Sequence, residues 1–524
     1  MNIYTVSFLL ILILNLIKNR RSLTMLQKNL YNENNRYLKW VFKNWKTIFV
    51  SLDFISFIFL LLAYILDNDL SIYLVIISFI IYLLEITRIL NNDKLYMDEK
   101  KLVITKRVKR LLFTLAVLFL LPIIFYLVDD KNIYLTLVIE GFITYFSYLM
   151  VVVAEIINIP VERIVYNYYA IKAKKKLKDM KNLKVIGITG SYGKTTCKNI
   201  LSDILNVKYI ARPTPRNLNT KYGLMLTINN YLDRFDDIFI AEMGASRMGD
   251  IKSLCDMVQP KYGVLTRIGL SHLDTFGSPQ NILETKFELI DNLPSDGVAI
   301  LNIDDKKQSS YQIKSKCKKI WIGIENENAD IRALNIKYDY QGTKFEVKFK
   351  DEDKSYPFET KLLGKLNIYN ILTGIALGKE LGISIQDLQL GVSKIKNTST
   401  RLELKDYGYM YQMKDFSVST IGVKDALDAL KMMHGTKVVV TKEMNEIDGN
   451  IKEFNHMLGN RIADISDYII LVDEKKSRLV FEGIQESGYD KEKLFIVNDI
   501  SDAYNLLQSL KSKKDMYVLF LGED

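Results

Sequence analysis

The sequence predicts an α-helical transmembrane bundle followed by an α/β protein. Long apolar runs are concentrated in the first 160 residues, whereas the rest of the chain alternates charged and apolar residues as globular domains do. A strand pattern, a glycine-rich loop and a helix pattern follow one another near residue 190, which is typical of a nucleotide-binding domain. At 524 residues, the chain is also too long for one hydrophobic core.

Charge and cysteine content exclude several classes of protein. The formal net charge of +10 does not indicate nucleic-acid binding, because the basic residues are concentrated in loops that border apolar segments. The three cysteines, Cys197, Cys255 and Cys317, have no paired spacing, which argues against a disulfide framework and a zinc site. A reducing compartment is therefore expected.

Five apolar stretches are predicted to span a membrane. They cover residues 3–17, 47–66, 71–87, 111–128 and 133–154. The first is short and could be read as a signal peptide, but no small-residue cleavage site follows it, so we interpret it as an uncleaved anchor. Residues 1–160 are thus predicted to form a membrane domain, and residues 161–182 a basic cytoplasmic linker.

The charges of the loops predict the orientation of this bundle. Residues 18–46 and 88–110 each carry eight Lys or Arg residues, whereas residues 67–70 carry none and residues 129–132 only Lys131. Because basic loops stay on the cytoplasmic side, the amino terminus is expected outside and the later domains in the cytoplasm, as for an integral protein of the cytoplasmic membrane. Glu140 lies well inside a span; we expect it to provide packing polarity, with a role in binding substrate or carrier lipid as the alternative.

A phosphate-binding loop is predicted directly after an apolar strand at residues 183–189. Glycines let backbone amides approach the phosphates, Lys194 reaches the outer phosphates, and Thr195 is placed to bind magnesium. The nucleotide contacts expected from this loop are Gly190, Ser191, Gly193, Lys194, Thr195 and Thr196. A strict Walker A motif would have glycine at Ile188, so a chance glycine turn is the alternative.

This loop, Gly187-x-Thr189-Gly190-Ser191-x-Gly193-Lys194-Thr195-Thr196, resembles that of the Mur ligases, which extend peptides on cell-wall (peptidoglycan) precursors. Residues 212–223 resemble the D-alanyl-D-alanine-adding type, MurF, and further segments follow the order of the family. These further segments are residues 241–245, 266–274, 285–288, 300–305, 364–370 and 400–403. The resemblance implies a central ATP-binding Mur-ligase domain at residues 183–404. Alternating strands and helices predict a Rossmann-like carboxy-terminal domain at residues 405–524, with its clearest strands at residues 438–440, 468–472 and 517–521.

The resemblance also implies an ATP-dependent, ADP-forming acid–amino acid ligase that works through an acyl phosphate and Mg2+. Glu242 ends the apolar strand at residues 238–241, where an acidic residue suits a metal ligand; a solvated strand-end acid is the alternative. His272 follows the apolar strand at residues 262–266. A lone histidine is usually structural, but the resemblance implies that His272 binds metal.

Lys286 lies in the apolar stripe of a helix that Ser278 and Pro279 are predicted to start. Loss of hydration lowers the pKa of such a lysine, and its neutral amine can react with carbon dioxide to form a magnesium-binding carbamate. The resemblance implies the same modification; a snorkelling lysine is the alternative. The predicted catalytic residues are Lys194, Lys286, His272 and Glu242, and the predicted metal ligands are Thr195, Glu242, His272 and Lys286.

Further nucleotide contacts are implied by the resemblance alone. Asn302 would face the adenine, and Asn367 and Asn370 would lie near the nucleotide, although each suits an ordinary turn or cap. Arg401 matches an arginine at the hinge between the central and carboxy-terminal domains; an exposed linker arginine is the alternative.

The chain departs from the family pattern in three places. Apolar spans replace the amino-terminal domain that binds the uridine nucleotide, which favours a substrate presented by the bilayer. In the carboxy-terminal domain, residues 413–419 and 442–447 keep only part of two family motifs, so the identity of the amine is open. Arg267 and Leu366 stand where the family usually has asparagine and histidine.

We therefore predict a carboxylate–amine ligase that acts on a lipid-linked cell-envelope precursor at the cytoplasmic membrane face. Its expected partners are the lipid bilayer, an amino acid or dipeptide amine and a carboxylate acceptor, with no nucleic acid. One alternative is a conventional UDP-N-acetylmuramoyl-tripeptide:D-alanyl-D-alanine ligase tethered to the membrane. Others are a non-catalytic ATP-binding scaffold and a transport ATPase, although the sequence has no LSGGQ-like signature.

Overall fold

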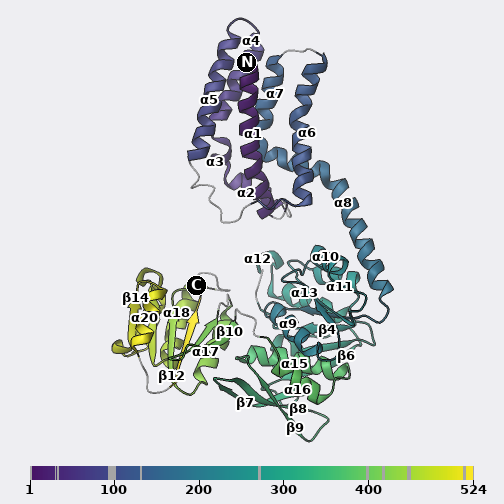
Figure 1. The fold of residues 1–524 in the computed structure, drawn as a ribbon, viewed down its shortest axis with the longest axis vertical. Helices are drawn as coiled ribbons and strands as arrows, with labels where there is room; N and C mark the ends of the chain where they lie inside the picture. Colours follow the sequence, from purple (N-terminus) through teal and green to yellow (C-terminus); the bar gives the residue numbers. More distant parts are fainter. Residues whose placement is uncertain are drawn as a thin grey trace. The chain divides into compact units, whose positions relative to one another are not determined.

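The protein forms two compact units, residues Met1–Tyr168 and Tyr169–Asp524. The structure, a computed structural model, describes residues 3–29, 31, 35–91, 102–129, 133–269, 273–396, 401–415, 419–444, 450–510 and 515–522. The first unit is helical and the second is α/β (Figure 1).

The first unit is a bundle of helices, most of which are apolar. They are α1 (Ile3–Lys28), α2 (Arg36–Lys43), α3 (Trp45–Phe49), α4 (Leu52–Leu66), α5 (Ser71–Asn91), α6 (Lys106–Asp129), α7 (Ile133–Tyr145) and α8 (Ser147–Asp179), which continues into the second unit. Among the described residues, three helices are long and apolar enough to cross a membrane, at Ile3–Lys28, Ser71–Asn91 and Lys106–Leu127. The helix at Leu52–Leu66 is apolar but shorter.

The stretch at residues 133–154, expected to be a span, is broken in the structure, and its role as a span stays a prediction. The pair α7 and α8 has the required length and apolarity only when taken together, and it is bent by 87°. Phe146 lies at the break, with its ring centroid 4.6 Å from Phe142 and 4.7 Å from Tyr145. The Tyr145 hydroxyl donates to the Phe49 carbonyl at 2.9 Å. Aromatic packing therefore fixes a change of direction that hydropathy does not register, because both sides of the break are apolar.

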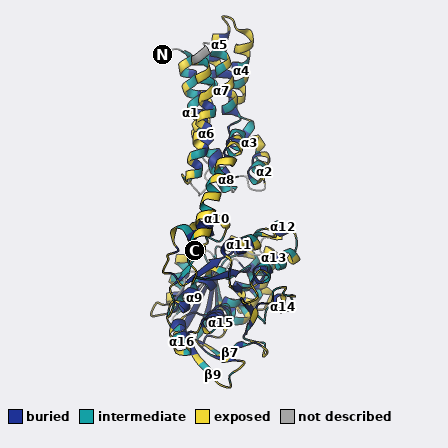
Figure 2. Ribbon diagram, turned by 90° about the vertical axis from the view of Figure 1, so that its right-hand side faces the viewer, coloured by how far each residue is buried: buried dark blue, intermediate teal, exposed yellow. Residues whose placement is uncertain are grey.

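Apolar side chains fill the inside of this bundle and also cover its outside. Ile11, Leu14 and Leu60 are buried in the core, whereas exposed residues, yellow in Figure 2, follow the outer faces of the helices. Exposed apolar side chains include Leu62 and Ile80. A bundle that is apolar on both sides suits a lipid environment.

The first sheet of the α/β unit has nine strands in the order β2-β3-β1-β4-β5-β6-β7-β8-β9. The strands are β1 (Lys184–Thr189), β2 (Ala211–Pro213), β3 (Ile238–Glu242), β4 (Tyr262–Leu265), β5 (Val298–Asn302), β6 (Lys318–Gly323), β7 (Ile331–Asp339), β8 (Gly342–Phe349) and β9 (Ser355–Thr360). Pairings from β2 to β7 are parallel, and β7, β8 and β9 pair antiparallel. Parallel strands bring their carboxyl ends to one edge, where ligands bind in such sheets.

Helices cover both faces of this sheet. The helices are α9 (Lys194–Leu205), α10 (Lys221–Asn230), α11 (Asp250–Val258), α12 (Leu273–Phe276), α13 (Pro279–Asp291), α14 (Lys306–Ser309), α15 (Lys365–Glu380) and α16 (Ile385–Ser393). Ile186 and Ile188 of β1 join the core beneath α9, α15 and α16. A Cβ at Gly187, between them, would lie 2.7 Å from Leu289 of α13. The alternation along β1 therefore holds α9 and α13 on opposite faces.

The second sheet has six strands in the order β10-β11-β15-β12-β13-β14. They are β10 (Arg401–Asp406), β11 (Tyr411–Asp415), β12 (Thr436–Thr441), β13 (Tyr468–Val472), β14 (Leu494–Val497) and β15 (Met516–Leu521). Pairing of β10 with β11 is antiparallel and the other pairings are parallel. The helices are α17 (Thr420–Lys431), α18 (Ile451–Ile465), α19 (Arg478–Glu486) and α20 (Ile500–Ser509). Strands β12, β13 and β15 form where the sequence predicts the clearest strands.

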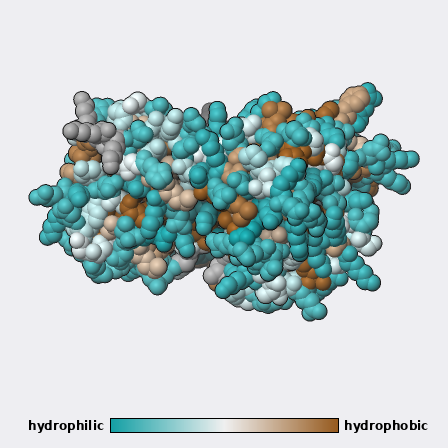
Figure 3. All heavy atoms as spheres, turned by 90° about the horizontal axis from the view of Figure 1, so that it is seen from below, coloured by the Kyte–Doolittle hydropathy of each residue, from teal (hydrophilic) through white to brown (hydrophobic). Residues whose placement is uncertain are grey.

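The surface of the α/β unit differs from that of the helical unit. The face seen in Figure 3 is largely hydrophilic, with small separate hydrophobic patches. Such a surface is ordinary for a water-facing domain.

Candidate active site

The glycine-rich loop joins β1 to α9 at the carboxyl edge of the first sheet. Gly190 has a φ of 149°, and a Cβ there would lie 2.0 Å from the Thr266 hydroxyl oxygen, so only glycine fits. Gly193, with a φ of 81°, precedes the first residue of α9. The Ser191 amide donates to the Arg267 carbonyl at 2.9 Å. The loop is thereby held against the segment that follows β4, with the amino terminus of α9 at its end.

Lys194 opens α9 and turns back over the loop. Its Nζ donates to the carbonyls of Gly190 at 2.7 Å and Ser191 at 3.2 Å. Burial lowers the pKa of the Lys194 ammonium, and the charge of Glu242 partly opposes this shift. A cation in this place is suited to the outer phosphates of a nucleotide.

Glu242, the last residue of β3, is the centre of a buried polar cluster. Its carboxylate is 1% exposed and accepts from the Thr195 hydroxyl at 3.0 Å, from Lys198 Nζ at 2.9 Å and from Asn219 Nδ2 at 3.1 Å. Its backbone amide donates to the Thr214 hydroxyl at 3.2 Å. These contacts fix the carboxylate directly beside the first turn of α9.

The donor set at this point fits magnesium. The Thr195 hydroxyl and the Glu242 carboxylate are hard oxygen ligands of the kind that Mg2+ prefers, and they lie within 3.2 Å of each other. No group of three or more His, Cys, Asp or Glu side chains with metal-binding geometry occurs in the described parts of the chain. His272 lies outside the described residues, so its predicted role as a metal ligand stays a prediction.

Lys286 is a buried amine on α13. Its side chain is 2% exposed, and its Nζ lies 5.6 Å from the centroid of the Phe276 ring. Burial is the largest cause that lowers the pKa of Lys286 to about 7, and the positive charge of Lys194 lowers it further. The charges of Asp250 and Glu288 act in the opposite direction. Lys286 therefore lies near the loop lysine and is poised to lose its proton close to neutral pH.

A cavity lies between residues of the first sheet and residues of the second. It is lined by Gly193, Thr196, Asn302, Asn367, Asn370 and Asp425, among others. The Asn302 Oδ1 accepts from the Asp304 amide at 2.9 Å, and Asn367 Nδ2 donates to the Leu363 carbonyl at 2.7 Å. Both asparagines thus line the cavity while each makes a local turn or helix contact. Their adenine and nucleotide contacts stay predictions.

The structure describes only the backbone of Arg401, which begins β10 and pairs with Asp415 of β11. The contact with phosphate that the resemblance implies for this arginine therefore stays a prediction.

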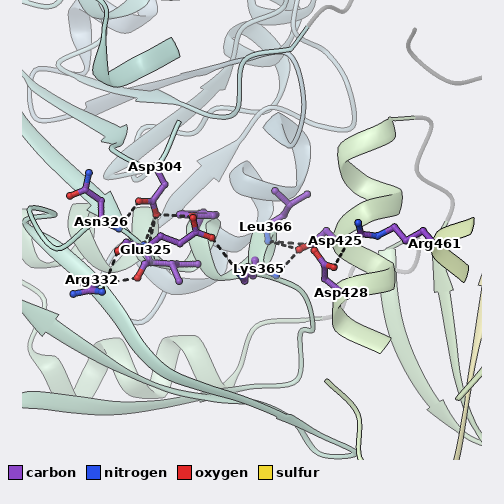
Figure 4. A network of polar contacts seen from close by, with 11 residues as sticks. Asp304, Glu325, Asn326, Arg332, Lys365, Leu366, Asp425, Asp428 and Arg461 are labelled. Atoms are coloured by element: carbon purple, nitrogen blue, oxygen red, sulfur yellow. Dashed lines mark hydrogen bonds and ion pairs between the residues drawn. The ribbon is translucent and has the colours of Figure 1, made fainter. Parts of the chain in front are cut away.

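Asp425 of α17 closes this cavity from the side of the second sheet. Its carboxylate accepts from the backbone amides of Lys365 at 2.8 Å and Leu366 at 3.3 Å, at the amino terminus of α15 (Figure 4). Burial is the main cause that raises the pKa of Asp425 to about 7, and these two amides oppose the shift. One turn along α17, Asp428 pairs with Arg461 (Figure 4). A carboxylate beside the second sheet thereby caps a helix that packs on the first sheet.

Sequence reasoning did not identify three residues of this site. Lys198 lies three positions after Thr195 on one helical face, and this spacing is the signal that could have found it. Asn219 belongs to the segment that resembles MurF, but its contact with Glu242 is visible only in three dimensions. Asp425 has no motif around it, so no sequence signal pointed to it.

Comparisons with known proteins find relatives in one family. Residues 188–378 match the Mur ligase middle domain family. The chain is 30% identical over 356 residues to the UDP-N-acetylmuramoyl-tripeptide--D-alanyl-D-alanine ligase of Bacillus subtilis (strain 168). The aligned region covers 66% of this chain and 74% of that protein. The crystal structure of MurF ligase from Thermotoga maritima in complex with ADP is 26% identical, with a TM-score of 0.58 over 68% of this chain and 80% of that one. A MurF structure from Acinetobacter baumannii, 24% identical over 68% of this chain and 77% of that one, has a TM-score of 0.58 and shares the fold.

Proposed function

Because the chain belongs to the Mur ligase family of ATP-dependent, ADP-forming amide ligases, we propose that it joins an amine to a carboxylate of a cell-envelope precursor through an acyl phosphate. The observation that carries this proposal is the buried Glu242 cluster beside Lys194 and the glycine-rich loop. We assign residues 1–160, 161–182, 183–404 and 405–524 to the membrane, linker, central and Rossmann-like domains.

The proposed reaction has two steps. An oxygen of the acceptor carboxylate attacks the γ-phosphorus of ATP, the bond to the bridging oxygen breaks, and ADP leaves. The amine nitrogen then attacks the acyl carbon, phosphate leaves, and the nitrogen loses a proton. Lys194 and the amides of the glycine-rich loop hold the phosphates. Thr195 and Glu242 would hold Mg2+, which would supply positive charge to offset the charge of the phosphates.

Lys198 acts through Glu242 in this proposal. Its ammonium and the Asn219 amide hold the carboxylate in place, next to the Thr195 hydroxyl. A buried charge without a partner is strongly destabilising, so Lys198 keeps the charged carboxylate available as a metal ligand.

We further propose that Lys286 is carbamylated. Its amine nitrogen attacks carbon dioxide, loses a proton and becomes an anionic carbamate with two oxygens that can bind metal. A pKa of about 7 leaves roughly half of the amine neutral at neutral pH, and burial protects the product from water. His272 is proposed as a further metal ligand, and Asn302, Asn367 and Arg401 as nucleotide contacts.

The proposed acceptor is lipid-linked. Named relatives act on a UDP-N-acetylmuramoyl tripeptide and D-alanyl-D-alanine, whereas this chain has a helical unit, with at least three helices able to cross a membrane, ahead of its ATP-binding domain. Anchoring at a bilayer raises the encounter rate with an acceptor in the same bilayer. We place the α/β unit on the cytoplasmic face and the amino terminus outside, because residues 18–46 and 88–110, at one end of the predicted spans, are rich in Lys and Arg.

The test compares lipid-linked and soluble precursors, by mass spectrometry, from cells with the wild-type protein and with Lys194→Ala. We expect the lipid-linked pool of the variant to lack the mass of one amino acid or dipeptide. Accumulation of an unmodified UDP-linked precursor, with an unchanged lipid pool, would favour the conventional soluble substrate. With purified protein, ADP release that needs neither carboxylate nor amine would refute the ligase.

A further inference from the structure

Helix α8 carries an exposed apolar stripe. Ile164 is 69% exposed and Ile171 67%, and the exposed side chains recur at intervals of four and three residues. The stripe consists of Ile157, Val161, Ile164, Tyr168 and Ile171. This spacing aligns them along one face of a helix, over about 21 Å at 1.5 Å per residue. Residues 161–182, expected to be a basic linker, are thus helical up to Asp179 and apolar on one side.

The opposite face of α8 packs against the other helices of the first unit. Three polar side chains of α8 contact α6, and they are Glu155, Asn158 and Glu162. Their partners are Arg107 at 3.0 Å, the Thr114 hydroxyl at 2.7 Å and Arg110 at 2.8 Å. Because these contacts hold one face of the helix, the stripe on the other face points away from the bundle.

The start of α8 lies where aromatic and basic side chains are concentrated. The Tyr148 carbonyl accepts from the Tyr37 hydroxyl at 3.0 Å, and the ring centroids of Tyr148 and Trp40 are 6.3 Å apart. The first turns of α6, which α8 contacts, carry four basic residues ahead of an apolar run. Aromatic and basic residues in such an arrangement mark the head-group level of a membrane. From this level, α8 departs from the direction of α7 by 87° and extends beyond the other helices of the unit (Figure 1).

Basic residues accompany the stripe. From Arg163 to Lys178 the chain has six Lys or Arg residues and no Asp or Glu. Lys176 donates to the Leu232 carbonyl, and the other five form no ion pair with any residue that the structure describes. A second copy of α8 would place these like charges side by side, and residues 157–171 provide only about two heptads, fewer than a coiled coil needs. An anionic lipid surface suits both the apolar stripe and the positive charge.

We propose that residues 157–171 of α8 bind the anionic surface of a membrane. The stripe would lie at the boundary between head groups and acyl chains, with the basic side chains against lipid phosphates. Only a short segment would then separate the bound helix from β1, which would keep the ATP-binding domain close to the bilayer. This inference rests on the proposed membrane location of the first unit, and not on the ligase reaction.

The test measures how accessible one thiol on the stripe is. Cys197, Cys255 and Cys317 are all buried, so Ile164→Cys gives the full chain one exposed thiol. Its rate of reaction with a water-soluble maleimide is compared in phosphatidylcholine nanodiscs with and without phosphatidylglycerol. We expect phosphatidylglycerol to slow the reaction about tenfold or more, because each basic residue near an anionic surface strengthens binding about fivefold.

Charge variants show whether α8 itself makes the contact. Lys175 stands one turn after Ile171 on the face of the stripe, and Lys172 lies beside it. Lys172→Gln together with Lys175→Gln should remove most of the protection, whereas the corresponding pair of arginine substitutions should keep it. Lys316→Gln with Lys319→Gln is the matched control, because it removes two exposed lysines of the α/β unit and should leave the protection unchanged.

Three results would overturn the proposal. Equal loss of protection in the control pair would mean general attraction of a basic protein to anionic lipid. Equal reaction rates in the two kinds of nanodisc would mean that anionic lipid does not cover the stripe, and disulfide-linked dimers of oxidised Ile164→Cys protein would identify a second copy as the partner. Lys194→Ala, added to Ile164→Cys, should abolish the ligase reaction and leave the protection unchanged, so the two proposals fail separately.

Discussion

Replacement of Asp425 by asparagine should stabilise the protein at alkaline pH and have little effect at acidic pH. The Asp425 carboxylate caps α15 through the amides of Lys365 and Leu366, and an asparagine Oδ1 can accept the same two bonds. The substitution therefore removes a charge and preserves the contact between α17 and α15.

The sign follows from the pKa of Asp425. It is raised from the ordinary value of 3.8 to about 7, mainly by burial. Between these two values, the folded protein keeps a proton that the unfolded chain releases, so the stability of the wild type falls as pH rises and stays low above pH 7. A shift of this size corresponds to about 4 kcal/mol. Because the side chain is partly exposed to the cavity, this value is an upper limit.

The assay is thermal unfolding of the detergent-solubilised full chain, followed by tryptophan fluorescence, across pH 5 to pH 8.5. The difference in midpoint between Asp425→Asn and wild type should be smallest at pH 5, grow up to about pH 7 and change little above it. Asp428→Asn is the matched control, because it removes a carboxylate from an exposed ion pair one turn along the same helix. A difference that does not change with pH, or a variant less stable at every pH, would refute the reasoning.

Three further outcomes are expected near the glycine-rich loop. Gly190→Ala should abolish ATP binding, measured by isothermal titration calorimetry, because its Cβ would lie 2.0 Å from the Thr266 hydroxyl oxygen; retained affinity would contradict the loop geometry. Lys198→Met should lower the free energy of unfolding, measured by denaturant titration, by about 3–5 kcal/mol, because it leaves Glu242 charged and buried without its partner. A smaller loss would mean that water reaches the carboxylate. The initial rate of ADP release should rise through pH 7 and with added bicarbonate, as the Lys286 amine becomes neutral, and Lys286→Arg should remove both dependences.

The local parts of the site could be predicted from sequence, because each lies within one short segment. The loop at Gly190–Thr196, the acid at the end of β3 and the buried Lys286 follow from a motif, a strand end and an apolar helix stripe. The Mur ligase fold of the α/β unit follows from the order of such segments along the chain, and the relatives and solved structures confirm it.

Contacts between distant segments could not be predicted in this way. Glu242 and Lys198 are 44 residues apart, and Asp425 accepts from an amide 60 residues away. Contacts over such separations leave no periodic pattern in the sequence. The break at Phe146 was missed for a related reason, since hydropathy averages over a window and carries no information on direction. The roles of His272 and Arg401 stay predictions.

The short helices of the first unit have a consequence for the bilayer around them. Helices α4 and α7 pack against each other and contain 15 and 13 residues, or about 22 and 20 Å of length at 1.5 Å per residue. A hydrocarbon core is about 30 Å thick. When inserted, this side of the bundle would be too short for its surroundings, so the two leaflets should draw together beside it. Local thinning of this kind would bring lipid head groups closer to the ends of α4 and α7.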